Sequence, residues 1–188
     1  MKKIILASGS PRRKQLLEWA EIPFEIVVRE PDETFPAGLK VEEVAIHIAR
    51  QKATAVRSMV KNDSVVLAAD TIVVLNDRII GKPKSREDAI NILSDLSGHQ
   101  HRVITGVVIV SDKKEISFSD STDVYFHELK AEQIGFYVDK YKPYDKAGAY
   151  AIQEWIGVVG IQSVRGDFYN VMGLPVSRVV RELKNITG

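Results

Sequence analysis

The sequence predicts an α/β fold with a mixed sheet, because strand-like and helix-like segments alternate along its 188 residues. Asn76-Asp77 stands between two β-rich runs and indicates a two-residue hairpin turn, so the sheet should be mixed. The chain holds no low-complexity tract and no internal repeat. Its length is typical of a single domain, which we expect over residues 1–188.

The first half of the chain is expected to alternate strands with three helices. Ser10 and Pro11 are typical of an N-cap and first helical residue. Ser85 with Asp88 three residues later indicates another helix start, and Gly98 its end. Apolar residues at helical spacing predict the long middle helix. The expected strands are 3–7, 24–28, 65–75 and 78–80, and the expected helices are 11–20, 41–61 and 85–98.

The second half continues the alternation. Residues 101–110 and 115–126 alternate like paired strands across a short polar turn. The remaining expected elements are helices over 131–140 and 175–185 and strands over 150–153 and 158–163.

Composition excludes several classes of function. Lys plus Arg number 26 and Asp plus Glu 25, so the net charge of +1 argues against nucleic acid as a partner. With no cysteine, the chain has no disulfides, thiol catalysis or cysteine zinc sites, and we expect a cytoplasmic protein. The longest nearly apolar stretch, Val65–Leu75, is interrupted by Asp70, so no membrane association is expected.

The segment Ser8–Lys14 predicts a phosphate-binding loop. A strand runs into a Gly/Ser turn and then into a helix N-terminus, where unpaired backbone N–H groups can hold an anion. Three cations in the first helical turn oppose the helix dipole, at about 0.3–1 kcal/mol each unless an anion compensates. The alternative is a solvated basic cap. The candidate ligand contacts are Ser8, Ser10, Arg12 and Arg13.

Lys52 and Asp70 break the pattern of their surroundings. Lys52 falls on the apolar stripe of its helix, so its amine either reaches the surface or meets an anionic ligand. Asp70 lies inside an apolar strand, where a carboxylate needs a partner. It is either a salt-bridge partner of a lysine, or a metal ligand or general base.

Two weaker candidates lie in turns and loops. Lys82 is at the tip of a Gly-Lys-Pro turn, and Glu33 is in an acidic loop. The chain has no P-loop, no G-x-G and no H-E-x-x-H pattern. Any metal site should therefore be rich in carboxylates and favour Mg²⁺ or Mn²⁺.

Seven motifs, taken in order, closely resemble the Maf family of nucleoside triphosphate pyrophosphatases over nearly the whole chain. They are Ser8-x-Ser10-Pro11-Arg12-Arg13, Lys52-Ala53, Ala69-Asp70-Thr71, Gly81-Lys82-Pro83, Thr105-Gly106, Asp145-Lys146-Ala147-Gly148-Ala149-Tyr150 and Asn170-Val171-Met172-Gly173-Leu174-Pro175. The last departs from the family pattern, with Asp167-Phe168 where many members have Ser-Tyr.

The resemblance implies an elongated, two-lobed fold like that of inosine triphosphate pyrophosphatases, with a central cleft. It also implies a homodimer that cleaves nucleoside triphosphates between the α and β phosphates, giving monophosphate and pyrophosphate with a divalent metal. Gln153 resembles the branch that acts on dTTP and UTP, with Arg12 and Thr71 at the other positions tied to base choice. Modified pyrimidine nucleotides are further expected substrates.

The resemblance suggests a mechanism. Glu33 and Asp70 would share the metal, and Asp70 would accept the proton of an attacking water that the metal makes more acidic. Lys82 and Lys52 would join the two arginines in offsetting phosphate charge, while the serines hydrogen-bond the phosphates.

Three alternatives remain open. One is a non-catalytic nucleotide-binding regulator of cell division, and another is a pyrophosphatase with a different base preference. The third, a phosphomonoesterase with an aspartate nucleophile, is disfavoured because no second aspartate stands two residues after Asp70.

Overall fold

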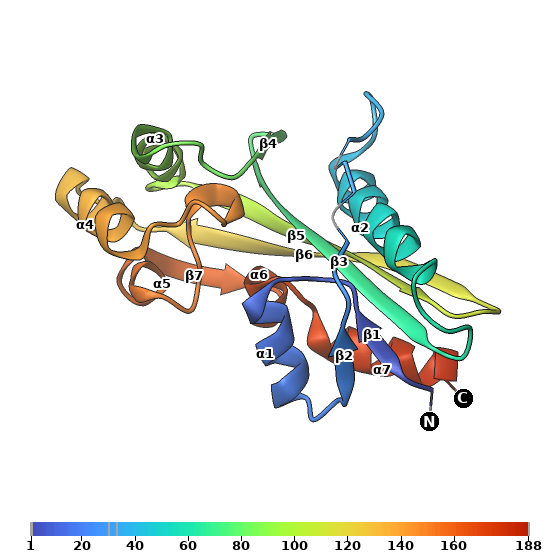
Figure 1. Ribbon diagram of the computed structural model, residues 1–188. Helices are drawn as coiled ribbons and strands as arrows, with labels where there is room; N and C mark the ends of the chain where they lie inside the picture. Colours follow the sequence, from blue (N-terminus) through green and yellow to red (C-terminus); the bar gives the residue numbers. More distant parts are fainter. Residues whose placement is uncertain (1, 30, 33, 188) are drawn as a thin grey trace. The chain divides into compact units, whose positions relative to one another are not determined.

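The computed structural model describes residues 2–29, 31–32 and 34–187. Seven strands form one mixed sheet in the order β2-β1-β3-β5-β6-β7, with β4 pairing to β3 (Figure 1). The α/β prediction with a mixed sheet is confirmed. The strands are β1 Ile4–Leu6, β2 Phe24–Ile26, β3 Val65–Leu75, β4 Arg78–Ile80, β5 Gln100–Val110, β6 Glu115–Phe126 and β7 Ile161–Arg165.

Helices connect these strands along the chain. The α-helices are α1 Pro11–Trp19, α2 Val41–Arg57, α3 Arg86–Leu96, α4 Ala131–Tyr141, α5 Trp155–Gly160, α6 Phe168–Met172 and α7 Val176–Thr187, and a 3₁₀ turn, η1, covers Ala147–Ala149. Among the described residues, no helix is both long enough and apolar enough to cross a membrane.

The sheet combines parallel and antiparallel pairs. Strand β1 lies parallel to β2 and β3, with Leu6 opposite Leu67 at its end. Strand β4 runs antiparallel to β3 through the predicted hairpin, where Asn76 and Asp77 have φ values of 49° and 60°. Two consecutive left-handed residues are the signature of a type I′ turn, whose twist matches that of the strands.

The predicted helix starts are confirmed, and one helix end is not. Ser10 and Ser85 cap α1 and α3, each accepting a hydrogen bond from the backbone N–H three residues on. Helix α2 ends at Arg57 rather than at residue 61. The Arg57 guanidinium donates to the carbonyls of Lys61, Asn62 and Ser64, which stabilises a turn there instead of further helix.

The contacts between residues divide the chain into two compact units. Unit 1 comprises Met1–Thr71, Thr105–Asp120 and Gly173–Gly188, and unit 2 comprises Ile72–Ile104 and Ser121–Met172. Strands β3, β5 and β6 contribute residues to both units. The single domain expected over residues 1–188 stays a prediction.

The apolar core of unit 1 lies between α2 and the sheet. Its buried members come from α2, from three strands and from the residue directly after β1, and all are small or β-branched. They are Ile5, Ala7, Ala49, Ala53, Val56, Val66, Ala68 and Val108. The alanines let the helix approach the strands closely, and this packing positions the polar side chains described below.

Two predicted strands near residue 155 are wrong in whole or in part. Residues 150–153 form no strand, because the Ala151 N–H donates to the Tyr137 hydroxyl (3.2 Å) instead of to a neighbouring strand. Residues 158–160 belong to α5, and only from Ile161 does β7 begin. Gly157 packs so closely on the Ile152 carbonyl that a Cβ would lie 1.7 Å from its oxygen, a contact that the tight α5 turn requires. Helix α6 was not predicted.

Candidate functional site

The turn after β1 leads into the N-terminus of α1. The Ser10 N–H donates to Ser8 Oγ at 3.2 Å, and Ser10 Oγ in turn accepts from the Arg13 N–H at 3.5 Å. Ser8 is buried, whereas Arg12 is half-buried. The loop therefore presents a helix N-terminus with two ordered serines, the arrangement that the sequence predicted for binding an anion.

Arg13 is buried and donates to three residues of unit 1 that lie far apart along the chain. Its Nε donates to the Gly173 carbonyl at 2.7 Å, its Nη1 to Ser8 Oγ at 3.1 Å and its Nη2 to Thr71 Oγ1 at 3.0 Å. Arg13 is one of the three cations in the first turn of α1, and these protein acceptors stabilise its charge there without a ligand.

Asp70 and Lys52 form an ion pair in unit 1. Lys52 Nζ lies 2.6 Å from Asp70 Oδ1, and the side chains are 17% and 14% exposed. Asp70 therefore has a lysine partner, and the Lys52 amine ends at a carboxylate rather than at the surface. The register of β1 on β3 ends at Leu67, so Asp70 lies beyond the carboxyl end of β1, the usual place for ligands in such sheets.

The faces of the sheet divide the polar residues into two sets. Side chains alternate along a strand, so Asp70 points towards α2 while Thr71 points to the opposite face, where Arg13 lies. On β5, Gly106 faces α2, and a Cβ there would be 2.3 Å from the Ala45 carbonyl carbon. Only glycine permits this close approach of α2, the helix that carries Lys52.

In unit 2, the turn that carries Lys82 lies against η1. The Gly148 N–H donates to the Gly81 carbonyl at 3.1 Å. Gly148 has a φ of +72°, and a Cβ there would lie 2.9 Å from a Val73 methyl group, so both the backbone and the packing require glycine. Lys82 is exposed on this turn.

A polar network holds the segment that carries Gln153. Tyr137, fully buried, donates to Glu154 Oε2 while accepting from the Ala151 N–H. Lys146 Nζ lies 2.7 Å from Asp145 Oδ1 and 3.7 Å from Glu154 Oε1. Gln153, between these anchored residues, is exposed.

Beneath that segment lies an aromatic cluster. His101 Nε2 is 2.7 Å from the Tyr150 hydroxyl, and the His101 ring stacks on Phe126 with centroids 5.4 Å apart. Burial lowers the pKa of His101 to about 4 and raises the pKa of Tyr150. Both side chains are therefore neutral near pH 7 and serve as packing and hydrogen-bonding groups.

The structure brings most of the predicted site residues together within unit 1. These are Ser8, Ser10, Arg12, Arg13, Lys52, Asp70 and Thr71. Lys82 and Gln153 belong to unit 2. Glu33, predicted as a metal ligand, lies outside the described residues. Thr105, Tyr137 and Glu154 were not predicted as site residues, although Thr105 was part of a motif.

The described part of the chain contains no cluster of three or more His, Asp or Glu side chains that could hold a metal. Asp70 is the carboxylate placed among the unit 1 site residues. Mg²⁺ at nucleotide sites takes one or two carboxylates and completes its shell with phosphate oxygens and water. The residues present therefore fit a metal that arrives with a nucleotide, and not one held by protein ligands alone.

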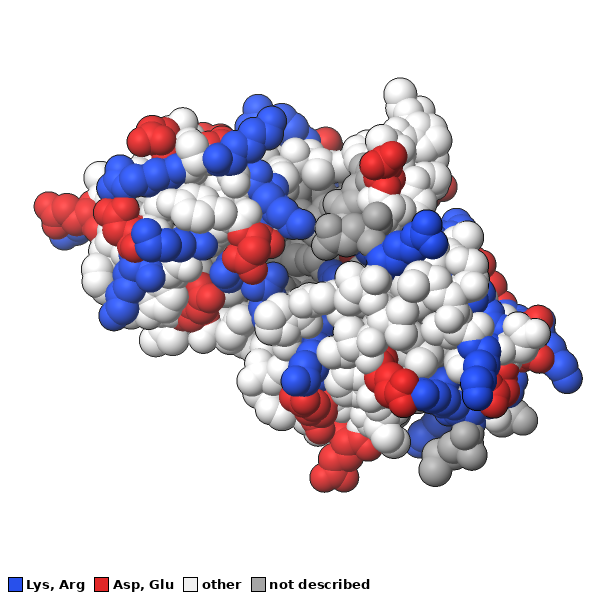
Figure 2. All heavy atoms as spheres, viewed as in Figure 1, with Lys and Arg blue, Asp and Glu red and all other residues white. Residues whose placement is uncertain are grey.

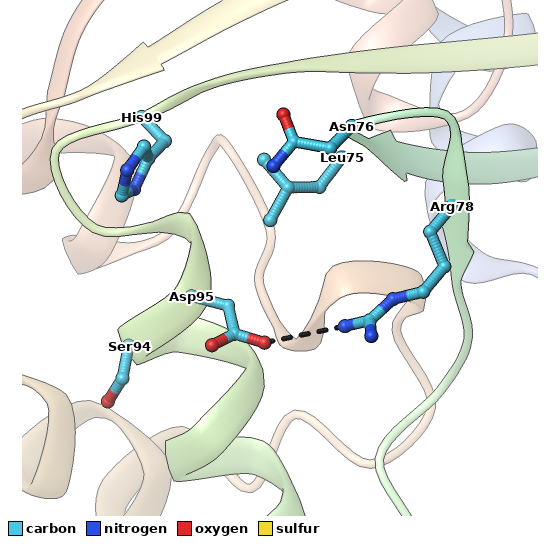
Figure 3. A pocket seen from close by; sticks show the side chains of 6 residues that line it. All are labelled: Leu75, Asn76, Arg78, Ser94, Asp95 and His99. Atoms are coloured by element: carbon cyan, nitrogen blue, oxygen red, sulfur yellow. Dashed lines mark ion pairs between the residues drawn. The ribbon is translucent and has the colours of Figure 1, made fainter.

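A pocket of about 480 Å³ lies in unit 2, and neither of the predicted residues of that unit lines it. Figure 3 shows its lining, where Arg78 reaches towards Asp95 with Nη2 and Oδ2 3.5 Å apart. It is lined by Leu75, Asn76, Arg78, Ser94, Asp95 and His99. On the face shown in Figure 2, Lys and Arg are interspersed with Asp and Glu, as the net charge of +1 implies.

Comparisons with known proteins identify the family of this chain. Residues 3–186 match the family model described as Maf-like protein. Three similar proteins are named dTTP/UTP pyrophosphatase. The protein of Parabacteroides distasonis is 48% identical to this chain, and the match covers 97% of this chain and 95% of the relative. The protein of Cytophaga hutchinsonii is 50% identical, and the match covers 97% of this chain and 84% of the relative. The Bacillus cereus protein is 51% identical, and the match covers 98% of this chain and 95% of the relative.

Among solved structures, a nucleoside-triphosphatase / dITP/XTP pyrophosphatase from Mycobacterium abscessus is similar over 99% of this chain and 98% of its own. The TM-score is 0.45 at 13% sequence identity. Family membership follows instead from the family model, which spans all but the terminal residues, and from relatives near 50% identity over nearly their whole length. The chain belongs to the Maf family.

Proposed function

We propose that this protein hydrolyses nucleoside triphosphates, dTTP and UTP in particular, to the monophosphate and pyrophosphate. The observation that carries the proposal is the arrangement of unit 1. There, the helix N-terminus that is predicted to bind an anion and the Lys52–Asp70 pair both lie at the carboxyl end of β1. The names of the relatives support the choice of substrate.

The loop after β1 is proposed to bind the phosphates. Ser8 Oγ already accepts hydrogen bonds from the Ser10 N–H and from Arg13, which fills both of its acceptor positions. Its hydroxyl hydrogen can then only be donated, and a phosphate oxygen is a suitable acceptor. The backbone N–H groups at the start of α1 and the half-buried Arg12 add positive potential.

Asp70 is proposed as the general base. It would accept a proton from the water whose oxygen forms the new bond to the α-phosphorus. The bond from that phosphorus to the bridging oxygen breaks, and pyrophosphate leaves with the electron pair. Lys52, 2.6 Å from Oδ1, holds the carboxylate in one orientation, which is what a positioned base requires.

A divalent ion, Mg²⁺ or Mn²⁺, is proposed as the cofactor, with Asp70 and Glu33 as its protein ligands. When bound, it would supply positive charge to the triphosphate oxygens and lower the pKa of a coordinated water. Lys82 is proposed to offset charge on the leaving pyrophosphate. The Gln153 amide carries both a donor and an acceptor, which suits the edge of a uracil or thymine ring, and Arg12 and Thr71 are the other proposed determinants of base choice.

Pyrophosphate release tests the proposal. Purified protein with Mg²⁺ or Mn²⁺ is assayed against canonical and modified nucleoside triphosphates, with Asp70→Asn as the inactive variant. The matched control is Asp112→Asn, because Asp112 is also paired with a lysine but lies away from the site. Release from UTP and dTTP that is lost only in Asp70→Asn supports the proposal.

Other results would change the conclusion. Release from purine nucleotides alone would keep the reaction and discard the base preference. Binding without release by the wild-type protein would indicate a nucleotide-binding regulator instead.

A further inference from the structure

We propose that Arg13 and Thr105 are positioning residues, which fix the Thr71 hydroxyl and thereby the strand segment that carries Asp70. Arg13 then contributes to the reaction through the protein and does not contact the substrate. The proposal rests on the proposed function, because it assigns roles for that reaction.

The Thr71 hydroxyl is surrounded by protein partners. Arg13 Nη2 donates to Thr71 Oγ1 at 3.0 Å, Thr105 Oγ1 lies 2.9 Å from it, and the Gly173 carbonyl oxygen lies 3.5 Å from it. A hydroxyl offers one hydrogen and two acceptor positions, so three partners use its full capacity. Thr71 Oγ1 therefore serves the protein, and a ligand can meet Thr71 only through its methyl group or backbone.

The geometry of Arg13 fits a connector better than a ligand contact. Three of its N–H donors point to Ser8, Thr71 and Gly173, which all belong to unit 1 but lie far apart along the chain. The guanidinium is planar and its donors have fixed directions, so it holds these three acceptors in one relative arrangement. A lysine, with one compact ammonium group, could not bond all three in this way.

Thr105 completes the arrangement from the neighbouring strand. It is fully buried on β5, one residue before the glycine against which α2 packs. Its hydroxyl fixes β3 at Thr71, while Gly106 admits the helix that carries Lys52. Because Asp70 and Thr71 share a peptide unit, a shift at Thr71 also moves the carboxylate. Proton transfer requires that carboxylate within about 0.5 Å of its productive position.

Kinetics of Thr105 variants test the proposal. Thr105→Val keeps the shape and removes the hydroxyl, whereas Thr105→Ser keeps the hydroxyl. For UTP hydrolysis, we expect Thr105→Val to lower kcat about 10- to 100-fold with KM within about twofold, since small displacements of a catalytic group have effects of this size. Thr105→Ser should restore most of kcat. Thr122→Val is the matched control, because Thr122 is equally buried and hydrogen-bonded, but in unit 2.

A purely structural role would lower the melting temperature of both valine variants and leave kcat of the folded enzyme unchanged. That result, or a failure of Thr105→Ser to restore kcat, would overturn the proposal. Arg13→Lys gives a second readout: we expect a loss in kcat, whereas a rise in KM alone would make Arg13 a substrate contact and overturn the proposal. If the wild-type protein releases no pyrophosphate, the proposed function itself fails, an outcome distinct from these.

Discussion

Acidification below pH 6.5 should destabilise the protein through His101. Burial lowers the pKa of His101 to about 4, against an ordinary value of 6.5. Between these values the unfolded chain binds a proton that the folded protein does not, so the free energy of unfolding falls as the pH falls. Above pH 6.5 the imidazole is neutral in both states and has no such effect.

The size of the effect follows from the two pKa values. At about 1.4 kcal/mol for each pH unit, the interval from 6.5 to about 4 corresponds to about 3 kcal/mol, of which about 2 kcal/mol is lost by pH 5. For a chain of 188 residues, that loss lowers the melting temperature by about 4–8 °C. The contacts of the His101 ring also disfavour its protonated form. Its Nε2 is hydrogen-bonded to the Tyr150 hydroxyl, and its Nδ1 is buried and has no hydrogen-bond partner among the described residues.

Urea unfolding between pH 7 and pH 5 measures the effect. The wild-type protein and His127→Gln should both lose about 2 kcal/mol, because His127 is exposed. His101→Gln removes the titrating group and should lose much less over the same range. An imidazole resonance of His101 that titrates near pH 6.5, or an unchanged pH dependence in His101→Gln, would refute the reasoning.

Three further changes and one matched control test the site and its framework. Asp70→Asn should lower kcat by about 10²- to 10⁴-fold, the usual contribution of a general base, while calorimetry still detects nucleotide binding; retained turnover would remove Asp70 from that role. Tyr137→Phe leaves the Ala151 N–H buried without its partner and should cost about 1–3 kcal/mol of stability in urea unfolding. Gly106→Ala places a methyl group against the backbone of α2 and should destabilise by about 1–3 kcal/mol or more. Gly135→Ala, in an open helical position, should instead stabilise by about 0.5–1 kcal/mol, and equal effects of the two alanines would contradict the packing argument.

Local chemistry allowed much of the fold to be predicted. The caps at Ser10 and Ser85 and the hairpin at Asn76-Asp77 depend on a few adjacent residues, and all three are confirmed. Residues 150–153 have the composition of a strand, yet their backbone is held by a tyrosine hydroxyl from α4. That competing partner comes from elsewhere in the chain, so the local pattern could not indicate it.

The site shows the same limit. Lys52 and Asp70 each break the apolar pattern around them and were singled out for that reason. Their pairing depends on the close packing of α2 on β5, which no local pattern reports. The sequence predicts that Arg13 contacts an anionic ligand. Only the fold shows that three of its N–H donors are directed at protein oxygens.

The bond from Arg13 to the Gly173 carbonyl spans 160 residues of chain. Unit 1 is built from three separate stretches, and the last of these begins at Gly173, after all of unit 2. During synthesis, a nascent chain therefore already carries Lys52, Asp70 and Thr71 long before the carbonyl that completes their support has been made. Contacts between residues so far apart also form slowly, because a long loop must be closed first. A ribosome-bound chain that lacks its last stretch consequently lacks the Gly173 carbonyl, so the proposed site can be completed only after the C-terminal segment has been made.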